Sequence, residues 1–173
     1  SSIDIEKAKH LSTQAKAKSH PSEYIHDNIG YNYRLSNISA AFGIAQLENI
    51  NDFIDKKNKI HTYYSKKLGI IDGIEFFKKN INSNCVIWLN TIKIDSKKYG
   101  INSRELMRIL NDNNIETRPL WQPIHKSVMY SDNYYYGRDN SEKFLNCLSI
   151  PSSVGLTLEQ QDKVIKIIKE NAK

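Results

Sequence analysis

The sequence predicts an α/β fold in which helices cover one face of a mainly antiparallel sheet. The prediction rests on residues 70–173, where alternating apolar segments indicate strands. Segments with apolar residues three and four apart indicate helices. The two kinds occur in the order strand, strand, helix, strand, loop, strand, helix. Residues 1–50 offer two helices and a loop but no strand, so we expect them to be the end of a larger lobe.

A helix is expected over residues 4–16, and a long polar loop over 17–35. The next helix begins at Ser36 or Asn37, because either side chain is able to accept from the first free backbone N–H groups. Its sequence, "NISAAFGIAQLE", is apolar around nearly the whole circumference. A helix of this kind is usually buried on most sides. We therefore expect it to be deeply packed and to hold the preceding loop in place.

A third helix is expected over residues 51–68, where apolar positions form one stripe and Gly69 is a natural stop. Residues 36–68 are then able to form one bent helical connection between two lobes. Two later helices begin with capping-box patterns, one at "NSRE" and one at "TLEQ".

Strands are expected over residues 74–77 and 85–94, the second covered at least partly on both faces. A short strand at 115–118 should end at Pro119, which lacks an N–H for the ladder. A last strand is expected in "CLSIP". These four segments make up the predicted sheet.

The 173-residue chain has a formal net charge of +6. Most of the excess is lysine, scattered between apolar helix positions, which indicates solvated helix faces; a nucleic-acid surface is the alternative. Cys85 and Cys147 lack metal-ligand spacing and are expected to be buried, reduced thiols, with a disulfide as the alternative. No apolar run reaches the roughly 20 residues that span a bilayer, and no leader pattern is present. We therefore expect a cytoplasmic protein that binds neither metal nor membrane.

The loop "HDNIGYNYRLSN" at residues 26–37 carries more binding chemistry than a solvated loop needs. Asn32 and the backbone N–H groups around Gly30 are able to bind an anionic oxygen, and Arg34 is able to hold a phosphate or carboxylate with two hydrogen bonds. Tyr31 and Tyr33 add flat surface and hydroxyl donors. A purely structural role for the loop is the alternative.

A second candidate segment is "TRPLWQPIH", where two prolines stiffen a loop that carries Arg118, Trp121 and His125. His125 is able to donate to a phosphate or to exchange a proton near neutral pH, although an ordinary surface histidine is the alternative. Ser152 and Ser153, before the last helix, are expected to be capping residues rather than nucleophiles, because no G-x-S-x-G pattern surrounds them.

Three segments, "HDNIGYNYRLSNISAAFGIAQLE", "IETRPLWQPIHK" and "LSIPSSVGLTLEQQDKVIKII", strongly resemble the C-terminal part of the DegT/DnrJ/EryC1/StrS aminotransferases. These enzymes use pyridoxal phosphate (PLP) and aminate keto-sugar nucleotides. The segment "HLSTQAK" is most similar to the legionaminic acid and bacillosamine branch, which aminates UDP-linked N-acetyl sugars. The resemblance implies the small domain of a fold-type I PLP aminotransferase over residues 70–173. Residues 1–50 would be the tail of the large domain, and 51–69 a linking helix.

The resemblance also implies a homodimer with active sites at the interface, into which the loop 26–35 of one subunit reaches. Asn32 would bind the PLP phosphate of the partner subunit. Tyr31 and Arg34 would face the sugar nucleotide. In the other segment, Trp121, His125 and Tyr130 would line the nucleotide-sugar pocket, whereas the resemblance gives no role to Arg118.

The Schiff-base lysine of the family lies in a segment upstream of the part that matches. No lysine of this chain occupies the matching motif. The resemblance therefore implies a fragment that is inactive alone and contains no catalytic residue, from a parent enzyme that uses glutamate as the amino donor. The alternatives are a non-catalytic regulatory or assembly homologue of the same family and a small basic nucleic-acid-binding module.

Overall fold

A computed structural model describes residues 2–19, 24–78, 82–83, 85–137, 141 and 143–173. The chain divides into two compact units, residues 1–50 and 51–173. Each unit is described by itself.

The first unit contains helix α1 (Ser2–Ser12) and helix α2 (Asn37–Glu48). Helix α1 ends four residues before the predicted position, because Gln14 and Ala15 adopt positive φ angles of 69° and 50° that no α-helix allows. Residues 20–23 of the predicted loop lie outside the described part. Helix α2 begins as expected, with Ser36 Oγ accepting from the backbone N–H of Ser39.

The expectation that α2 is deeply packed is wrong for this chain. No residue of α2 is buried, and Ile38 and Phe42 expose 85% and 68% of their surface. Within α2, only Glu48 carries a charge. The apolar pattern was interpreted correctly as a helix, but burial needs a partner surface that these residues do not contain.

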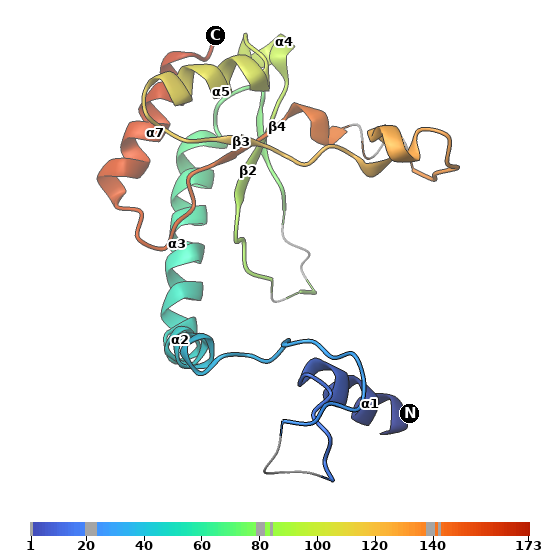
Figure 1. Ribbon diagram of the computed structural model, residues 1–173. Helices are drawn as coiled ribbons and strands as arrows, with labels where there is room; N and C mark the ends of the chain where they lie inside the picture. The colour runs from blue at the N-terminus through green and yellow to red at the C-terminus, as the bar shows by residue number, and fades with distance from the viewer. Residues whose placement is uncertain (1, 20–23, 79–81, 84, 138–140, 142) are drawn as a thin grey trace. The chain divides into compact units, whose positions relative to one another are not determined.

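The second unit is built on helices and a sheet (Figure 1). The helices are α3 (Ile50–Leu68), α4 (Ser96–Tyr99), α5 (Ser103–Asp112) and α7 (Leu158–Glu170). Both predicted capping boxes are confirmed. They join Asn102 with Glu105 at the start of α5, and Thr157 with Gln160 at the start of α7. Within the described part of this unit, short 3-10 turns occupy Ile124–Lys126, Val128–Tyr130 and Lys143–Asn146.

The sheet has the order β1-β2-β4-β3, and every pair of neighbours is antiparallel. Its strands are β1 (Ile74–Phe76), β2 (Asn90–Ile94), β3 (Arg118–Pro119) and β4 (Cys147–Ile150). The predicted α/β architecture with an antiparallel sheet is therefore confirmed.

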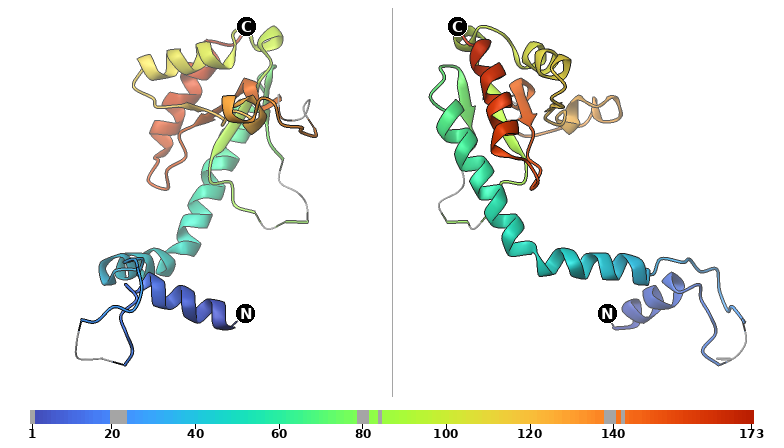
Figure 2. Two further views of the ribbon diagram at one scale, coloured as in Figure 1. Left: turned by 45° about the vertical axis from the view of Figure 1, so that its right-hand side comes forward. Right: turned by 90° about the vertical axis from the view of Figure 1, so that its left-hand side faces the viewer.

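One face of the sheet forms the core with the helices. In the central pair, Ile92 lies opposite Leu148, and both side chains are fully buried. Helices α3, α5 and α7 contribute buried apolar residues to the same cluster. Helices α3 and α7 also lie side by side (Figure 2), where the Tyr63 hydroxyl donates to Asp162 Oδ1 at 2.6 Å. The other face of β2 and β4 is more polar, with Thr91 Oγ1 3.0 Å from Ser149 Oγ.

Two strands differ from their predicted bounds. The strand expected over 85–94 begins only at Asn90, because β1 and β4 offer partners to β2 no further toward its start. The strand expected over 115–118 is instead Arg118–Pro119 and includes the proline that should have ended it. Pro119 is tolerated because β3 is the outer strand of the sheet, where a missing N–H costs no ladder bond.

The two cysteines are both free. Cys147 is fully buried, as expected, and burial raises the pKa of its thiol to about 11. Cys85 is exposed, so the expectation of a buried thiol there is wrong. It lies in the segment that does not form the predicted strand.

Replacing Ile92 with alanine is expected to lower the free energy of unfolding by about 2–5 kcal/mol, because it leaves a cavity in the core. The matched Ile70→Ala change, at a residue that is 80% exposed, is expected to stay within about 0.5 kcal/mol of the wild type. Urea unfolding followed by tryptophan fluorescence measures this unit alone, because Trp88 and Trp121 both lie in it. Equal losses in the two variants would contradict the assigned core.

The two thiols are expected to react at different rates with a disulfide reagent at pH 8. Cys85 should react in the folded protein, whereas Cys147 should react only on unfolding, because its buried thiol stays protonated. The same pKa shift predicts that stability falls as the pH rises above roughly 8.5, where an unfolded thiol begins to ionise. A Cys85→Ser variant should lose the fast reaction; two fast thiols in the wild type would refute the assignment.

Candidate functional site

The loop that carries Tyr31, Asn32 and Arg34 is paired with the end of α1 and with the turn that follows it. The Tyr31 N–H donates to Leu11 O at 2.7 Å, and the Tyr33 N–H donates to Ser12 O at 3.0 Å. In return, the Gln14 N–H donates to Tyr31 O at 3.0 Å. Asn32 forms a β-bridge with Thr13. The loop is therefore held by backbone hydrogen bonds to residues 11–14, rather than by α2 as predicted.

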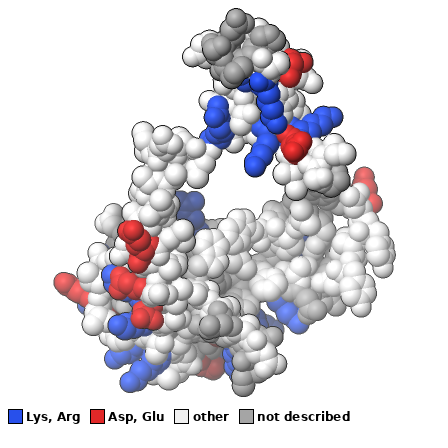
Figure 3. Space-filling view, turned by 90° about the horizontal axis from the view of Figure 1, so that it is seen from below, with Lys and Arg blue, Asp and Glu red and all other residues white. Residues whose placement is uncertain are grey.

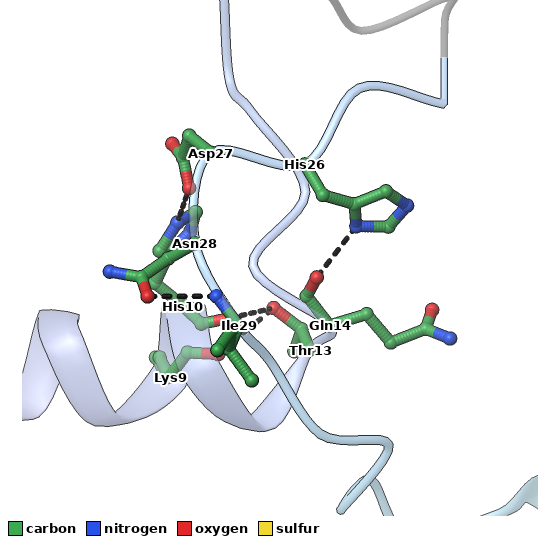
Figure 4. A network of polar contacts seen from close by, with 8 residues as sticks. All are labelled: Lys9, His10, Thr13, Gln14, His26, Asp27, Asn28 and Ile29. Carbon is green, nitrogen blue, oxygen red and sulfur yellow. Dashed lines mark hydrogen bonds and ion pairs between the residues drawn. The ribbon is translucent and has the colours of Figure 1, made fainter.

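Two histidines add side-chain contacts to this pairing (Figure 4). His10 Nε2 lies 2.5 Å from Asp27 Oδ1, and His26 Nδ1 lies 2.7 Å from Gln14 O. These contacts tie residues 26–27 to α1 and to the turn after it. Because Asp27 is about half exposed, the His10–Asp27 ion pair contributes at most about 1 kcal/mol. Their main effect is to fix the start of the loop before Gly30.

Gly30 is required by close backbone contact. A Cβ atom at this position would lie 2.3 Å from the carbonyl carbon of Gln14 and 2.4 Å from the backbone nitrogen of Ala15. No real Cβ contact is this short, so any larger residue would push the two paired segments apart. The glycine allows the main chain of the loop to pass directly against the turn at Gln14 and Ala15.

The side chains beyond Gly30 point into solvent. Tyr31 and Tyr33 expose 51% and 77% of their surface, and their rings stack with centroids 5.3 Å apart. Asn32 and Arg34 are also exposed. Among the described residues, neither side chain has a hydrogen bond or an ion pair. The loop thus combines a fixed backbone with two unpaired donors, an arrangement suited to binding an anion supplied from outside this unit.

In the second unit, Trp121 lies in an open groove that sequence analysis did not predict. The groove encloses about 520 Å³, and its lining includes Trp88, Arg118, Trp121 and residues 149–152. The indole rings of Trp88 and Trp121 are nearly parallel, with centroids 6.3 Å apart. Neither His125 nor Tyr130 lines this groove, so the structure does not bring the three predicted pocket residues together.

His125 packs against Tyr135, with ring centroids 4.2 Å apart and planes 14° from parallel. Its Nε2 atom is buried, and no described residue forms a hydrogen bond with it. His125 is therefore partly buried, and its ring does not present Nε2 to solvent as a donor. Tyr130, in the second 3-10 turn, exposes 42% of its surface.

A buried polar cluster next to the groove also went unpredicted. The Asn90 N–H donates to Ser152 Oγ at 2.8 Å. The Asn90 Oδ1 atom lies 2.8 Å from His61 Nδ1, within hydrogen-bond distance. Lys57 Nζ donates to the carbonyl oxygens of Trp88, at 2.8 Å, and Ser152. The expectation that Ser152 caps a helix is wrong. Its hydroxyl oxygen accepts from the backbone N–H of Asn90 in β2, and the cap of α7 is Thr157. Burial lowers the pKa of Lys57 from its ordinary value.

Lysine and arginine side chains are interspersed with acidic ones on the face that Figure 3 shows. This distribution does not favour the nucleic-acid-binding alternative, which needs clustered basic side chains. Within the described residues, no three His, Cys, Asp or Glu side chains gather as a metal site would require. Across the same residues, no helix has the length and apolar character needed to cross a membrane.

Comparison with known families gives one match over almost the whole chain. The model of the DegT/DnrJ/EryC1/StrS aminotransferase family matches residues 2–169. Among curated proteins, EpsN of Bacillus subtilis, named as a pyridoxal phosphate-dependent aminotransferase, is 34% identical over 95% of this chain and 42% of its own length. The GDP-perosamine synthase of Escherichia coli O157:H7 is 34% identical over 86% of this chain and 39% of its own length.

Solved structures agree on the fold. PseC of Helicobacter pylori, an aminotransferase involved in the biosynthesis of pseudaminic acid, has a TM-score of 0.81 at 19% identity. That match covers 99% of this chain and 47% of the PseC chain. The chain therefore spans less than half the length of these relatives.

Replacing Gly30 with alanine is expected to separate the loop from residues 11–15. The amide protons of Gln14, Tyr31 and Tyr33 should then exchange at least about ten-fold faster, because each loses a backbone hydrogen bond. Gly43→Ala is the matched control, since a Cβ at Gly43 meets no atom within 4 Å. Hydrogen exchange measured by NMR tests this, and unchanged exchange in Gly30→Ala would refute the close contact.

Proposed function

Because this chain belongs to the DegT/DnrJ/EryC1/StrS aminotransferase family, we propose that it forms the C-terminal part of a PLP-dependent sugar aminotransferase. The enzyme moves an amino group from glutamate to a 4-keto-6-deoxy nucleotide sugar used in surface-glycan biosynthesis. The observation that carries the proposal is the loop 26–35. Its backbone is fixed by hydrogen bonds and the close contact at Gly30, while the Asn32 and Arg34 side chains stand exposed.

In this proposal, residues 1–50 are the tail of the large PLP-binding domain and residues 51–69 form a linking helix. Residues 70–173 are the small domain. The exposed apolar surface of α2 supports the assignment of residues 1–50 to a larger domain. Large exposed apolar side chains such as Ile38 and Phe42 usually mark a surface that another part of the protein covers. The free thiols Cys85 and Cys147 are compatible with the reducing cytoplasm, where we place the enzyme.

The loop fits the phosphate end of PLP. The Asn32 side chain is exposed, and its carboxamide has two N–H donors. No described residue accepts a hydrogen bond from these donors. When bound, PLP supplies the electron sink that allows an amino group to pass between glutamate and a keto sugar. This chain contributes a donor that anchors the cofactor, and the lysine of the Schiff base comes from a part of the enzyme outside this sequence.

Arg34 and Tyr31 act on the substrate. The guanidinium of Arg34 is always charged and holds an anionic oxygen with paired hydrogen bonds, so it positions the phosphates of the sugar nucleotide. Tyr31, stacked on Tyr33, adds a hydroxyl beside it. The loop reaches into the active site of the partner subunit, so the enzyme works as a homodimer. Trp121, His125 and Tyr130 belong to the nucleotide-sugar pocket in the assembled enzyme.

The substrate we propose is a UDP-linked N-acetyl sugar. The segment "HLSTQAK" supports this assignment through its resemblance to the legionaminic acid and bacillosamine branch. A curated relative named as a GDP-perosamine synthase favours a GDP-linked sugar instead. Both substrates share the keto group and the diphosphate, so the proposed chemistry is the same, and the assay must offer both nucleotides.

The complete protein, supplied with PLP, glutamate and a UDP-4-keto-6-deoxy-N-acetyl sugar, is expected to form the 4-amino sugar, detected by mass spectrometry. The 173-residue chain alone should form none, because it lacks the Schiff-base lysine. Asn32→Ala in the complete protein should weaken PLP binding by roughly ten-fold, the cost of one hydrogen bond to a charged group. The exposed Asn51 gives the matched control, Asn51→Ala.

Absence of an aminated product with either UDP- or GDP-linked substrate would contradict the proposed reaction. If PLP still bound without turnover, the non-catalytic homologue would be the better description. If Asn32→Ala and Asn51→Ala bound PLP equally well, the role proposed for Asn32 would be wrong, whatever the activity.

A further inference from the structure

The groove beside β3 and β4 brings together the two tryptophans of the chain. Trp88 and Trp121 come from segments 33 positions apart, yet their indole rings lie nearly parallel, 21° between planes. They expose 62% and 71% of their surface. Folding usually buries such large rings. Two indoles held together but left open therefore form a flat apolar surface on which another ring is able to stack.

The position of Trp88 is fixed by Lys57. Its ammonium group donates to the carbonyl oxygens of Trp88 and Ser152, and both of these residues line the groove. Ser152 is itself bonded to Asn90, the first residue of β2. A cation on α3 thus joins the segment before β2 to the segment after β4. The Trp88 indole is therefore carried by a main chain that is hydrogen-bonded to α3.

The groove also has the charges that a nucleotide needs. Arg118 lies opposite Ser149 in the ladder between β3 and β4, so both belong to the face of the sheet away from the core. The Arg118 side chain is 78% exposed and contacts only Glu116 among the described residues, with Nε 3.0 Å from Oε1. Its remaining N–H groups are able to bind a phosphate. The Glu116 carboxylate is able to accept from a ring N–H or a ribose hydroxyl.

We propose that this groove holds the nucleoside diphosphate end of the sugar nucleotide, with the base stacked on the Trp88–Trp121 pair and the diphosphate bound by Arg118. The inference rests on the proposed function for the presence of a sugar nucleotide. It assigns Trp88 and Arg118 as substrate-binding residues and Lys57 as a positioning residue that acts through the main chain of Trp88. The volume of about 520 Å³ lies in the usual range for small-molecule sites.

The test measures the binding of UDP and of uridine to the complete protein by calorimetry, without substrate turnover. Trp88→Leu should weaken the binding of both compounds by about ten-fold, because both lose the stacked ring. Trp88→Phe should restore most of that loss. Arg118→Met should weaken UDP binding by a similar factor but leave uridine binding unchanged, since uridine has no phosphate. Tyr134→Leu, at a residue that is 94% exposed outside the groove, is the control for a lost surface ring.

Lys57→Met should raise the dissociation constant of both compounds without removing any group that touches them. Wild-type affinity in Trp88→Leu, or no binding of UDP to the wild type, would overturn the proposal. So would a loss of uridine affinity in Arg118→Met equal to that for UDP. If binding follows this pattern but the protein has no transaminase activity, the nucleotide site in the groove is supported and the proposed function is contradicted. A failure of the groove proposal is therefore distinguishable from a failure of the proposed function.

Discussion

The antiparallel register of β2 and β4 is the constraint on which the second unit depends. With Ile92 opposite Leu148, one face of the sheet is apolar and the other presents Thr91 and Ser149. A slip of one residue would exchange these faces, burying the hydroxyls and exposing the isoleucines. Asn90 secures the register at the strand end, because its N–H and its side chain are both bonded to Ser152. The separate register of β3 with β4 places Arg118 opposite Ser149, on the same open face.

Local signals in the sequence predicted the helices well. A cap is formed by residues three positions apart, so the pairs Asn102–Glu105 and Thr157–Gln160 are visible without knowledge of the fold. Strand bounds depend instead on which neighbours are available. Residues 85–89 have a strand-like alternation, but the ladder of β2 with β4 ends at Asn90, and its ladder with β1 ends at Ile92. The exposure of α2 has the same origin, since periodicity shows which residues seek burial but not what covers them.

The candidate site shows the same division. The chemistry of Asn32 and Arg34 is evident from their residue types and from the glycine before them. The backbone pairing of the loop with residues 11–14 is not, because it depends on how the chain folds back on itself. Trp88 was assigned to a strand, so its stacking with Trp121 was not foreseen. Lys57 was one of many lysines on a helix; only the carbonyl oxygens it binds distinguish it from its solvated neighbours.

The central claim is that the loop 26–35 serves an active site whose lysine lies on another subunit. Hybrid dimers test it most directly, by mixing a complete protein that carries Asn32→Ala and Arg34→Ala with one whose Schiff-base lysine is replaced. If the loop crosses the interface, a mixed dimer has one intact site, and random reassortment should restore about a quarter of wild-type activity. If the mixture stays as inactive as its two components, the loop serves its own subunit and the account is contradicted.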